Sequence, residues 1–313
     1  MSKRRLTTIV FALVVFCMAA AGESAYAQKK APLRYGPDKP CKVGYVTKVI
    51  IEQKDVNEVY LGMLIYDFET QDDGKVTVNF NGGLPEGRET KDGKRLPFIP
   101  RPPLPTRSLL FGGGGTIMRG NFLSTNKFQL SPLGEIEAFE GDSQLPYLLG
   151  NASLLIFEPL PEKPESSWES KSGVAVTEEE SHSSNLLLSP LGRTETRRVT
   201  AGSETASYTI KEEKGDLVTI AKKYHLDSPG IGQEGSGFTV DGEGVWTFDR
   251  KLGLPESFGY KQKLTISQEN MTVTFPITIA CKRATDEVLK TYLEKREQEN
   301  AEMQARMEQI RQE

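Results

Sequence analysis

The sequence predicts an all-β protein with two related antiparallel lobes, half-barrel or sandwich-like, followed by a charged C-terminal α-helix. Three observations predict this fold class. Apolar residues alternate with polar residues at a period of two in several runs, which is typical of antiparallel strands with one buried face. A short residue pattern occurs in both halves of the chain, and residues 284–313 are rich in charge without proline or glycine.

The first 27 residues have the pattern of a secretory signal peptide. Basic residues at 3–5 precede an apolar run from Ile9 to Ala21, and Ala-Tyr-Ala at 25–27 matches a cleavage site. The run is shorter than the roughly 20 residues that a membrane-spanning helix needs. We therefore expect cleavage, with retention as an anchor as the alternative, and an exported protein that is periplasmic or secreted and has no membrane span after cleavage.

The charge of the chain argues against nucleic-acid binding. Removal of three basic residues and Glu23 with the signal peptide changes the net charge from −4 to about −6. Nucleic-acid affinity comes largely from basic side chains that neutralise phosphates. A mildly acidic chain without a basic stripe therefore predicts other partners.

Period-two alternation predicts strands in both halves of the remaining chain. We place an N-terminal lobe at 28–160 and a C-terminal lobe at 161–283, with turns at Asp73-Gly74, Lys214-Gly215-Asp216 and Asp241-Gly242. Pro276 lacks an amide donor, so its strand is expected at a sheet edge or with a bulge. The alternating runs are 43–51, 60–68, 76–80 and 273–279.

Residues 82–107 interrupt the strand pattern of the N-terminal lobe. Proline and glycine are frequent there, with arginines between them. This composition predicts an extended surface loop. A ligand for a proline-recognising domain is the alternative.

The repeated pattern suggests an internal duplication with a shift of 109 residues. Phe139-Glu140 matches Phe248-Asp249, and each pair follows a glycine and precedes a Leu-Pro dipeptide. A hairpin signal lies upstream of each segment, at 68–80 and at 208–220. A proline-rich linker at 159–164 separates the two halves.

A resemblance to known proteins is carried by four features: the linker, Trp168, the second hairpin, and the strand Gly-Glu-Gly-Val-Trp-Thr-Phe-Asp at 242–249. Together they resemble uncharacterised exported bacterial proteins that are rich in β-structure, over about residues 155–282. Ser166-Ser167 departs from the glycine and acidic residue expected before the tryptophan. The resemblance implies a β-rich body and no particular chemistry.

Aromatic residues supply the candidate ligand-binding site. If the two lobes face each other, Phe139, Tyr208, Trp246 and Phe248 line a groove suited to an apolar small molecule. For Trp168 and Trp246, stacking on a sugar or lipid has an alternative, because each more often fills a β core.

Two cysteines remain after signal cleavage. Cys41 opens the first strand-like segment and Cys281 closes the last. A disulfide that ties the two ends together suits an oxidising compartment. Two unpaired thiols that pack as small hydrophobic groups are the alternative.

No motif indicates an active site, a metal site or a cofactor. His182 and His225 have no second histidine or cysteine at ligand spacing. Ser124 and Lys127 match the Ser-x-x-Lys spacing of penicillin-recognising enzymes, but the companion motifs of those enzymes are missing. Whether the protein is an enzyme therefore stays open, and the residues favour a function without catalysis.

The C-terminal tail at 284–313 predicts a charged helix that projects from the body. Leu289, Met303 and Ile310 keep a heptad spacing, although Arg296 occupies the position between them. A coiled coil is a weaker option.

The function expected from these features is binding. We expect an exported, non-catalytic envelope protein that binds an apolar ligand or another envelope protein through its inner β faces. The alternatives are a structural or assembly component that associates through the helical tail, and an unrecognised hydrolase.

Overall fold

The computed structural model describes residues 31–96, 126–140, 154–180, 196–229, 237–268 and 271–312, and Leu33–Glu313 belong to one compact unit. Several predicted features lie outside the described residues: the predicted signal peptide at 1–27, the C-terminal part of the predicted loop at 82–107, Ser124 and His182.

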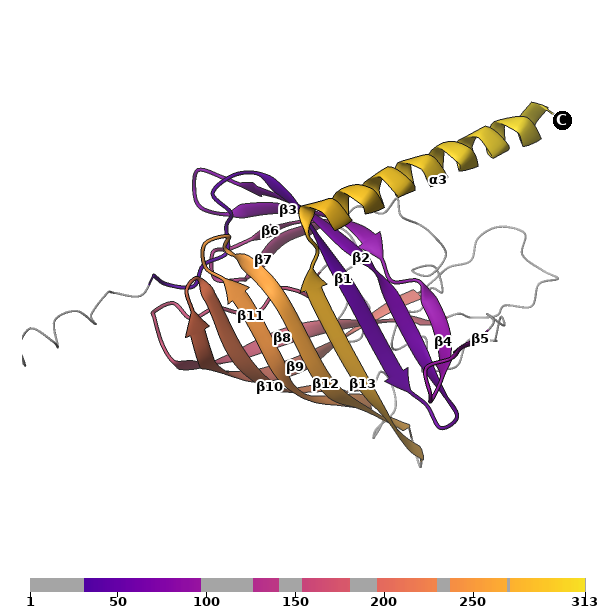
Figure 1. Ribbon diagram of the computed structural model, residues 1–313. Helices are drawn as coiled ribbons and strands as arrows, with labels where there is room; N and C mark the ends of the chain where they lie inside the picture. Colours follow the sequence, from indigo (N-terminus) through magenta and orange to yellow (C-terminus); the bar gives the residue numbers. More distant parts are fainter. Residues whose placement is uncertain are drawn as a thin grey trace, which may run out of the picture. The chain divides into compact units, whose positions relative to one another are not determined.

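The described strands form one antiparallel sheet, so the all-β class with a C-terminal helix is confirmed. The strand order is β7-β6-β3-β2-β1-β13-β12-β11-β10-β9-β8, with β4 paired to β2 and β5 paired to β4 (Figure 1). The elements are β1 (Cys41–Glu52), β2 (Val56–Thr70), β3 (Val76–Gly83), β4 (Glu86–Thr90), β5 (Arg95–Leu96), β6 (Asn126–Leu130), β7 (Ile136–Glu140), β8 (Ser167–Glu180), β9 (Thr196–Lys214), β10 (Leu217–Pro229), β11 (Gly237–Asp249), β12 (Leu254–Gln268), β13 (Met271–Arg283) and α3 (Asp286–Gln312).

Alternation along the strands separates an inner face from an outer face. In β1, Val43, Tyr45 and Val49 are buried, and in β11 the same holds for Trp246 and Phe248. Successive side chains of a strand point to opposite faces of the sheet. The period-two pattern in the sequence therefore reports this buried face directly.

The division into two lobes is not confirmed, because strands from both halves belong to the same sheet. β1 pairs along its length with β2 and also with β13, which is the last strand of the predicted C-terminal lobe. Buried residues of both halves form one hydrophobic cluster. The first and last strands meet in the middle of the sheet and join the halves.

The duplication is not confirmed either. Phe139 belongs to β7, which lies at one end of the strand order, whereas Phe248 belongs to β11, between β10 and β12. The hairpin β9-β10 pairs directly with β11, but β6 lies between β3 and β7. The two phenylalanines thus occupy unlike places in the sheet.

Part of the predicted surface loop at 82–107 is a pair of short strands. β4 pairs in register with β2 from Glu86 to Thr90, and β5 pairs with β4. The loop expectation was wrong for these residues, since none of its prolines falls between 86 and 96. Without a proline, each residue there keeps the amide donor that a strand ladder needs.

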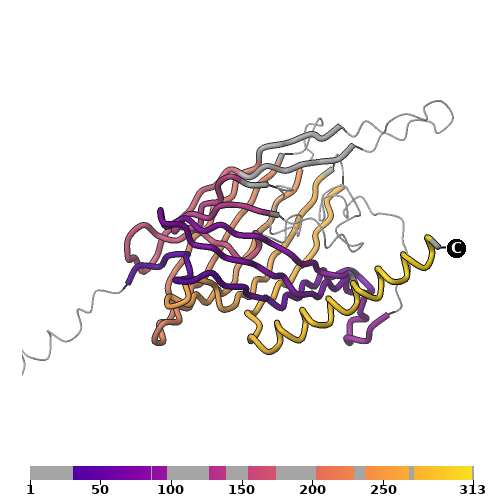
Figure 2. The backbone as a smooth tube through the Cα atoms, turned by 90° about the horizontal axis from the view of Figure 1, so that it is seen from above, coloured from indigo at the N-terminus to yellow at the C-terminus, as the bar shows by residue number. Residues whose placement is uncertain are grey.

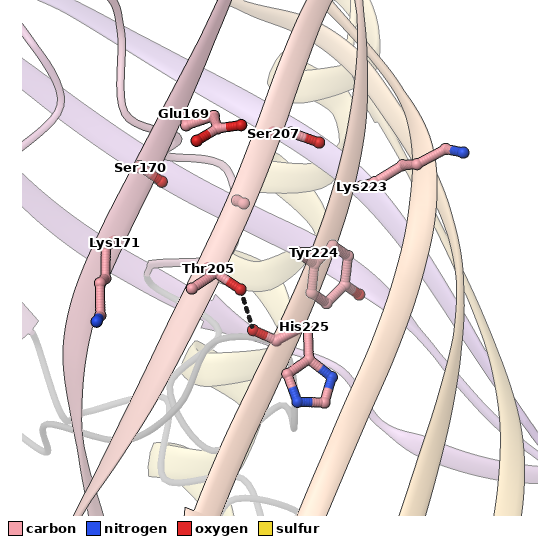
Figure 3. Close-up of a pocket in the computed structure, with 9 residues that line it drawn as sticks. Glu169, Ser170, Lys171, Thr205, Ser207, Lys223, Tyr224 and His225 are labelled. Carbon is pink, nitrogen blue, oxygen red and sulfur yellow. Dashed lines mark hydrogen bonds between the residues drawn. The ribbon is translucent and has the colours of Figure 1, made fainter.

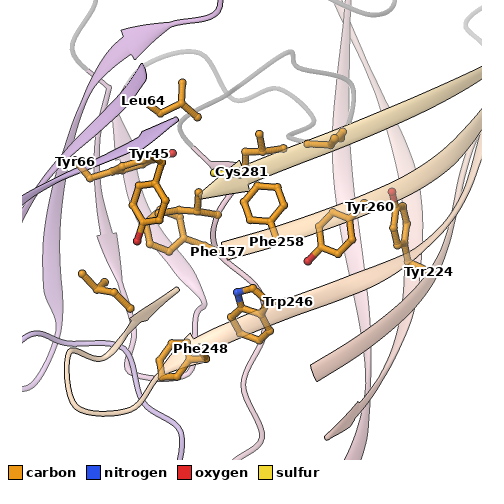
Figure 4. Close-up of a cluster of buried hydrophobic side chains, with 14 of the residues drawn as sticks. Tyr45, Leu64, Tyr66, Phe157, Tyr224, Trp246, Phe248, Phe258, Tyr260 and Cys281 are labelled. Carbon is orange, nitrogen blue, oxygen red and sulfur yellow. The ribbon is translucent and has the colours of Figure 1, made fainter. Parts of the chain in front are cut away.

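A segment between β7 and β8 lies against the inner face of the sheet. Phe157 contacts Tyr66, Phe68 and Phe128, with ring centroids 5.7, 6.2 and 5.5 Å away. Figure 4 shows Phe157 among inner-face side chains from several strands. We call Leu154–Pro161 the inner segment. Its side chains belong to the same hydrophobic cluster as those of the strands, and Figure 2 shows the curvature of the sheet.

The tail is a helix, as predicted, and only its beginning packs on the body. Leu289 is buried with Met63 and Ile65 on the outer face of β2, and Tyr292 and Leu293 pack against this cluster. Beyond this contact α3 extends away from the strands (Figures 1 and 2).

Candidate functional site

A charged group lies inside the sheet, where hydrophobic residues surround it. Lys222 on β10 has no exposed side-chain surface, and Glu158 on the inner segment is 2% exposed. The Lys222 Nζ atom donates to both carboxylate oxygens of Glu158 at 2.9 and 2.8 Å. Glu204 on β9 lies 3.5 Å from the same ammonium group. We call these residues, with Tyr208, Tyr224 and Tyr260, the Lys222 cluster.

Tyrosines complete the hydrogen bonding of the cluster. The Tyr208 and Tyr260 hydroxyls donate to Glu158 at 2.8 and 3.0 Å. The Lys222 ammonium group also lies 4.5 Å from the ring centroid of Tyr224, within the range of a cation–π interaction. Each Glu158 carboxylate oxygen thus accepts from Lys222 and from one tyrosine, which offsets the loss of its hydration.

The backbone of the inner segment holds Glu158 in place. The Tyr35 hydroxyl donates to the Glu158 carbonyl at 3.0 Å and accepts from the Glu158 amide at 2.9 Å. The Trp168 indole donates to the Pro159 carbonyl at 3.0 Å, and Arg34 donates to the Pro161 carbonyl at 2.9 Å. The segment is therefore fixed at several successive residues.

Asp241-Gly242, predicted as a turn, lies within β11 instead. Two glycines of this strand make room for the tyrosine rings. A Cβ atom on Gly242 would lie 2.2 Å from the Tyr224 ring, and one on Gly244 would lie 2.3 Å from the Tyr260 ring. Real Cβ atoms do not approach other atoms this closely. The Gly-x-Gly pattern therefore allows both rings to lie against the strand beside Lys222.

The environment keeps the tyrosines of the cluster protonated. Burial raises the pKa of Tyr208 and of Tyr260, and the nearby Glu158 carboxylate raises both further. Their hydroxyls therefore act as permanent hydrogen-bond donors. With Lys222 and Glu158 almost fully buried, the geometry is that of a structural ion pair rather than of an accessible reaction centre.

The structure places three of the four predicted groove residues in the packed core. Tyr208, Trp246 and Phe248 are at most 1% exposed. Tyr208 stacks on Trp168 at 5.0 Å, and Trp246 contacts Phe248 edge-on at 5.6 Å. Phe139 belongs to β7, but its side chain lies outside the described residues. The three described residues therefore lie in the packed core, which the sequence offered as an alternative for Trp246 only.

The predicted disulfide between Cys41 and Cys281 is not formed. Both cysteines are free. Cys281 lies opposite Thr47 in the pairing of β1 with β13, which puts Cys41 six residues farther along β1, or about 20 Å away at the usual rise of a strand. Disulfides need Cα atoms within about 7 Å. The Thr47 hydroxyl instead donates to the Cys281 sulfur at 3.1 Å.

A depression of about 560 Å³ lies over β8, β9 and β10 (Figure 3). His225, which sequence analysis considered as a metal ligand, lies there and contacts the Asp241 carboxylate through Nδ1 at 2.7 Å. Both side chains are more than half exposed. The depression is lined by Glu169, Ser170, Lys171, Thr205, Ala206, Ser207, Lys223, Tyr224 and His225.

The helix α3 has a docked part and a free part. Gly44 on β1 lies under the docked part, where a Cβ atom would be 2.9 Å from Leu289 and 2.7 Å from Met63. Arg296 donates to the Asn81 side chain at 3.3 Å. Every residue from Glu297 to Arg311 is exposed. We call Glu297–Gln312 the distal half of α3.

The distal half carries large apolar side chains on its exposed surface. Met303, Met307 and Ile310 are 62%, 54% and 68% exposed. Spacings of four and three residues place them on one face of the helix. Among the described residues, nothing packs on this apolar face.

Sequence reasoning missed Glu158 and Lys222. Lys222 stands in the inner register of β10, between the buried Ile220 and Tyr224. A lysine at an apolar position of a period-two run is the signal that could have found it. Glu158 follows the apolar run Leu-Leu-Ile-Phe at 154–157, which is a similar signal.

Within the part of the chain that the structure describes, no three histidine, cysteine or acidic side chains are grouped as a metal site. None of the described helices is both long enough and apolar enough to cross a membrane. Comparison with protein-family models, curated proteins and solved structures finds no match to this chain.

Proposed function

We propose that the protein is an exported, non-catalytic assembly component that joins another chain through the distal half of α3. In this proposal the curved sheet is the rigid body and the helix is the attachment. The observation that carries it is a helix that leaves the body after Arg296 and presents Met303, Met307 and Ile310 to solvent.

Helix stability supports a partner for this segment. An isolated helix of about 15 residues is marginal in water, since most helical stability in proteins comes from packing of an apolar face. The distal half has an apolar stripe but packs on nothing within the described residues. A second chain would supply the missing contact.

The inner face gives less support to the ligand-binding alternative. Tyr208, Trp246 and Phe248 already pack on other side chains. The inner segment also lies against this face through Phe157 and Glu158. A ligand at these residues would have to displace core packing, which is close to crystal density in proteins.

The test compares the full chain with a chain that ends at Arg296. The shorter chain keeps Leu289, Tyr292 and Leu293, so its body and the docked part of the helix should remain folded. Extracts of cells that make each protein are cross-linked and fractionated by size. We expect the full chain in complexes larger than the monomer and the shorter chain as a monomer.

Denaturant unfolding is the control for this comparison. The two chains should unfold at the same denaturant concentration, because the deleted residues contact no part of the described body. If the shorter chain enters the same complexes as the full chain, the distal half of α3 is not the attachment and the proposal fails.

A further inference from the structure

We infer that the partner of the distal half of α3 is a second copy of this chain, bound antiparallel. This inference rests on the proposed function and names its partner. Residues 297–312 of the two helices would pair side by side, with the two bodies at opposite ends of the helix pair.

The stripe that docks the helix continues into the exposed part. Leu289, Arg296, Met303 and Ile310 are seven residues apart, and Leu293, Asn300 and Met307 repeat at the same spacing. These are the a and d positions of a heptad pattern. Leu289 is 7% exposed and Met303 is 62% exposed, so one helix face is covered by the body at its beginning and open beyond it.

The position of the body selects the antiparallel orientation. Through Arg296 the body occupies the face that a partner helix would need. In a parallel pair the partner's helix would enter that space. An antiparallel register that sets Met303 against the partner's Met307 puts residue 298 opposite residue 312 of the other copy. The partner's helix therefore ends before it reaches the body.

Charges on the flanks of the stripe agree with this arrangement. The antiparallel register sets Glu297 beside the partner's Arg311, and twofold symmetry makes this contact twice. It also brings the two Arg306 side chains near the symmetry axis and sets Glu299 beside residue 313 of the other copy, and these are like-charge contacts. A parallel pair would set Arg306 beside the partner's Arg311 twice, with two like-charge contacts and no Glu–Arg pair between Glu297 and Arg311.

The contact is small. An overlap of about 15 helical residues is about 22 Å long, and it buries less than the roughly 1,200–2,000 Å² of stable interfaces. Asn300 also faces Ile310 of the other copy in this register. We therefore expect a reversible dimer with a dissociation constant in about the micromolar range or weaker.

The first experiment measures the mass of the purified full chain by sedimentation equilibrium from about 1 µM to about 1 mM, which brackets such a dimer. We expect a monomer–dimer equilibrium for the wild type. Met307→Glu should weaken the dimer about tenfold or more, because it places a charge in the contact. Ala305→Glu is the matched control on the opposite helix face and should leave the equilibrium unchanged.

The second experiment uses charge reversal at low ionic strength, where surface charges are least screened. Glu297→Arg and Arg311→Glu should each weaken the dimer about three- to tenfold, and the double variant should restore it. A dimer strengthened by Arg311→Glu would instead indicate the parallel pair, in which that residue faces the partner's Arg306, and would overturn the inference.

Two further results would also overturn it. One is a monomer at every concentration for the purified full chain. The other is hydrogen-exchange protection of residues 300–310 at a concentration where the chain is monomeric, since another part of the same chain would then cover the stripe. If the purified chain is monomeric but the complexes in cell extracts still require residues 297–313, the proposed function stands with a different partner.

Discussion

At the scale of single residues, the Lys222 cluster is the most unusual feature of the core. A buried ion pair contributes little net stability compared with apolar residues of the same volume, but removal of one partner leaves an uncompensated buried charge. Lys222 holds the inner segment against β10 through Glu158. Its contribution is therefore to fix one arrangement of the interior.

Lys222→Met should destabilise the protein by about 3–5 kcal/mol, because the Glu158 carboxylate loses its ionic partner in a buried site. Urea unfolding measures the effect. Lys223→Met is the matched control, since the neighbouring side chain is 77% exposed, and it should change stability by less than about 0.5 kcal/mol.

The double variant Lys222→Met/Glu158→Gln separates charge from packing. It should recover part of the loss, because the most deeply buried carboxylate, at Glu158, is then replaced by a neutral amide, while Glu204 keeps its charge. The role of the ion pair would be contradicted if the double variant lost more unfolding free energy than the two single variants lose together.

The Cys281 thiol should contribute to the change of the free energy of unfolding with pH in the alkaline range. Burial raises the pKa of its thiol from 9.0 to about 12. Between these values the unfolded thiol releases its proton while the folded thiol retains it, so the free energy of unfolding falls as pH rises from about 9 to about 12.

Urea unfolding across this pH range checks the Cys281 prediction. The buried tyrosines lose stability at high pH too, so the informative quantity is the difference between wild type and Cys281→Ala. The variant should show the shallower decline, and equal pH slopes would contradict the assignment to this thiol.

At the scale of elements, α3 docks because β1 presents a glycine beneath it. A side chain on Gly44 would overlap Leu289 and Met63. The Ala284 amide also donates to the Gly44 carbonyl at 2.7 Å, which sets where the chain turns from β13 into the helix. The close approach of α3 to the β1 backbone therefore depends on the lack of a side chain at Gly44.

Gly44→Val should release the docked part of α3 without unfolding the sheet, at a cost of about 1–3 kcal/mol for the added side-chain volume. Hydrogen exchange should accelerate at 286–296 and remain slow in β1 and β13. Gly259→Val is the control, because its Cβ atom meets only a carbonyl oxygen 3.9 Å away. Equal acceleration throughout the sheet would show that Gly44 supports the strands instead.

Pro276 lies in a strand with neighbours on both sides, although proline in a sheet is usually found at an edge or a bulge. The sequence predicts an edge strand or a bulge there, yet β13 lies between β1 and β12. Pairing of β13 with β1 extends only to Ile277. The proline therefore lies where that side of the strand is no longer paired, and its missing amide donor leaves no gap in the ladder.

At the scale of the whole molecule, the two halves of the chain share one sheet and one core. β1 and β13 join them by a continuous ladder, and the inner segment contacts Tyr66 from one half and Lys222 from the other. We expect these halves to unfold together, as a single cooperative unit does.

The variant Tyr66→Ala tests whether the two halves unfold together. The substitution lies in β2 and should remove about 3–5 kcal/mol, as for other large aromatic residues in cores. Fluorescence of Trp168 and Trp246 reports on the other half. Its transition should move to lower urea together with the circular dichroism signal, and Leu61→Ala, at a residue that is 53% exposed, should move neither. An unchanged tryptophan transition would indicate independent lobes.

The sequence by itself determined the strands that contain the alternating runs, which face of those strands is apolar, and that the tail is a helix, but it did not reveal β4 and β5. These features follow from period-two alternation and from the lack of proline and glycine at 284–313, which act over a few residues. It also marked Met303 and Ile310 as a heptad continuation of Leu289.

Only the tertiary structure decided how the strands are ordered, that Glu158 meets Lys222, and that Cys41 lies far from Cys281. Strand order depends on contacts between residues more than two hundred positions apart, such as Thr47 and Cys281, and no local pattern encodes such a pairing. The polarity of Lys222 was visible in the chain, but its partner was set by the path of the inner segment. A local repeat at Phe139 and Phe248 was likewise a poor guide to the fold, because a match of a few side chains does not fix which strands lie beside them.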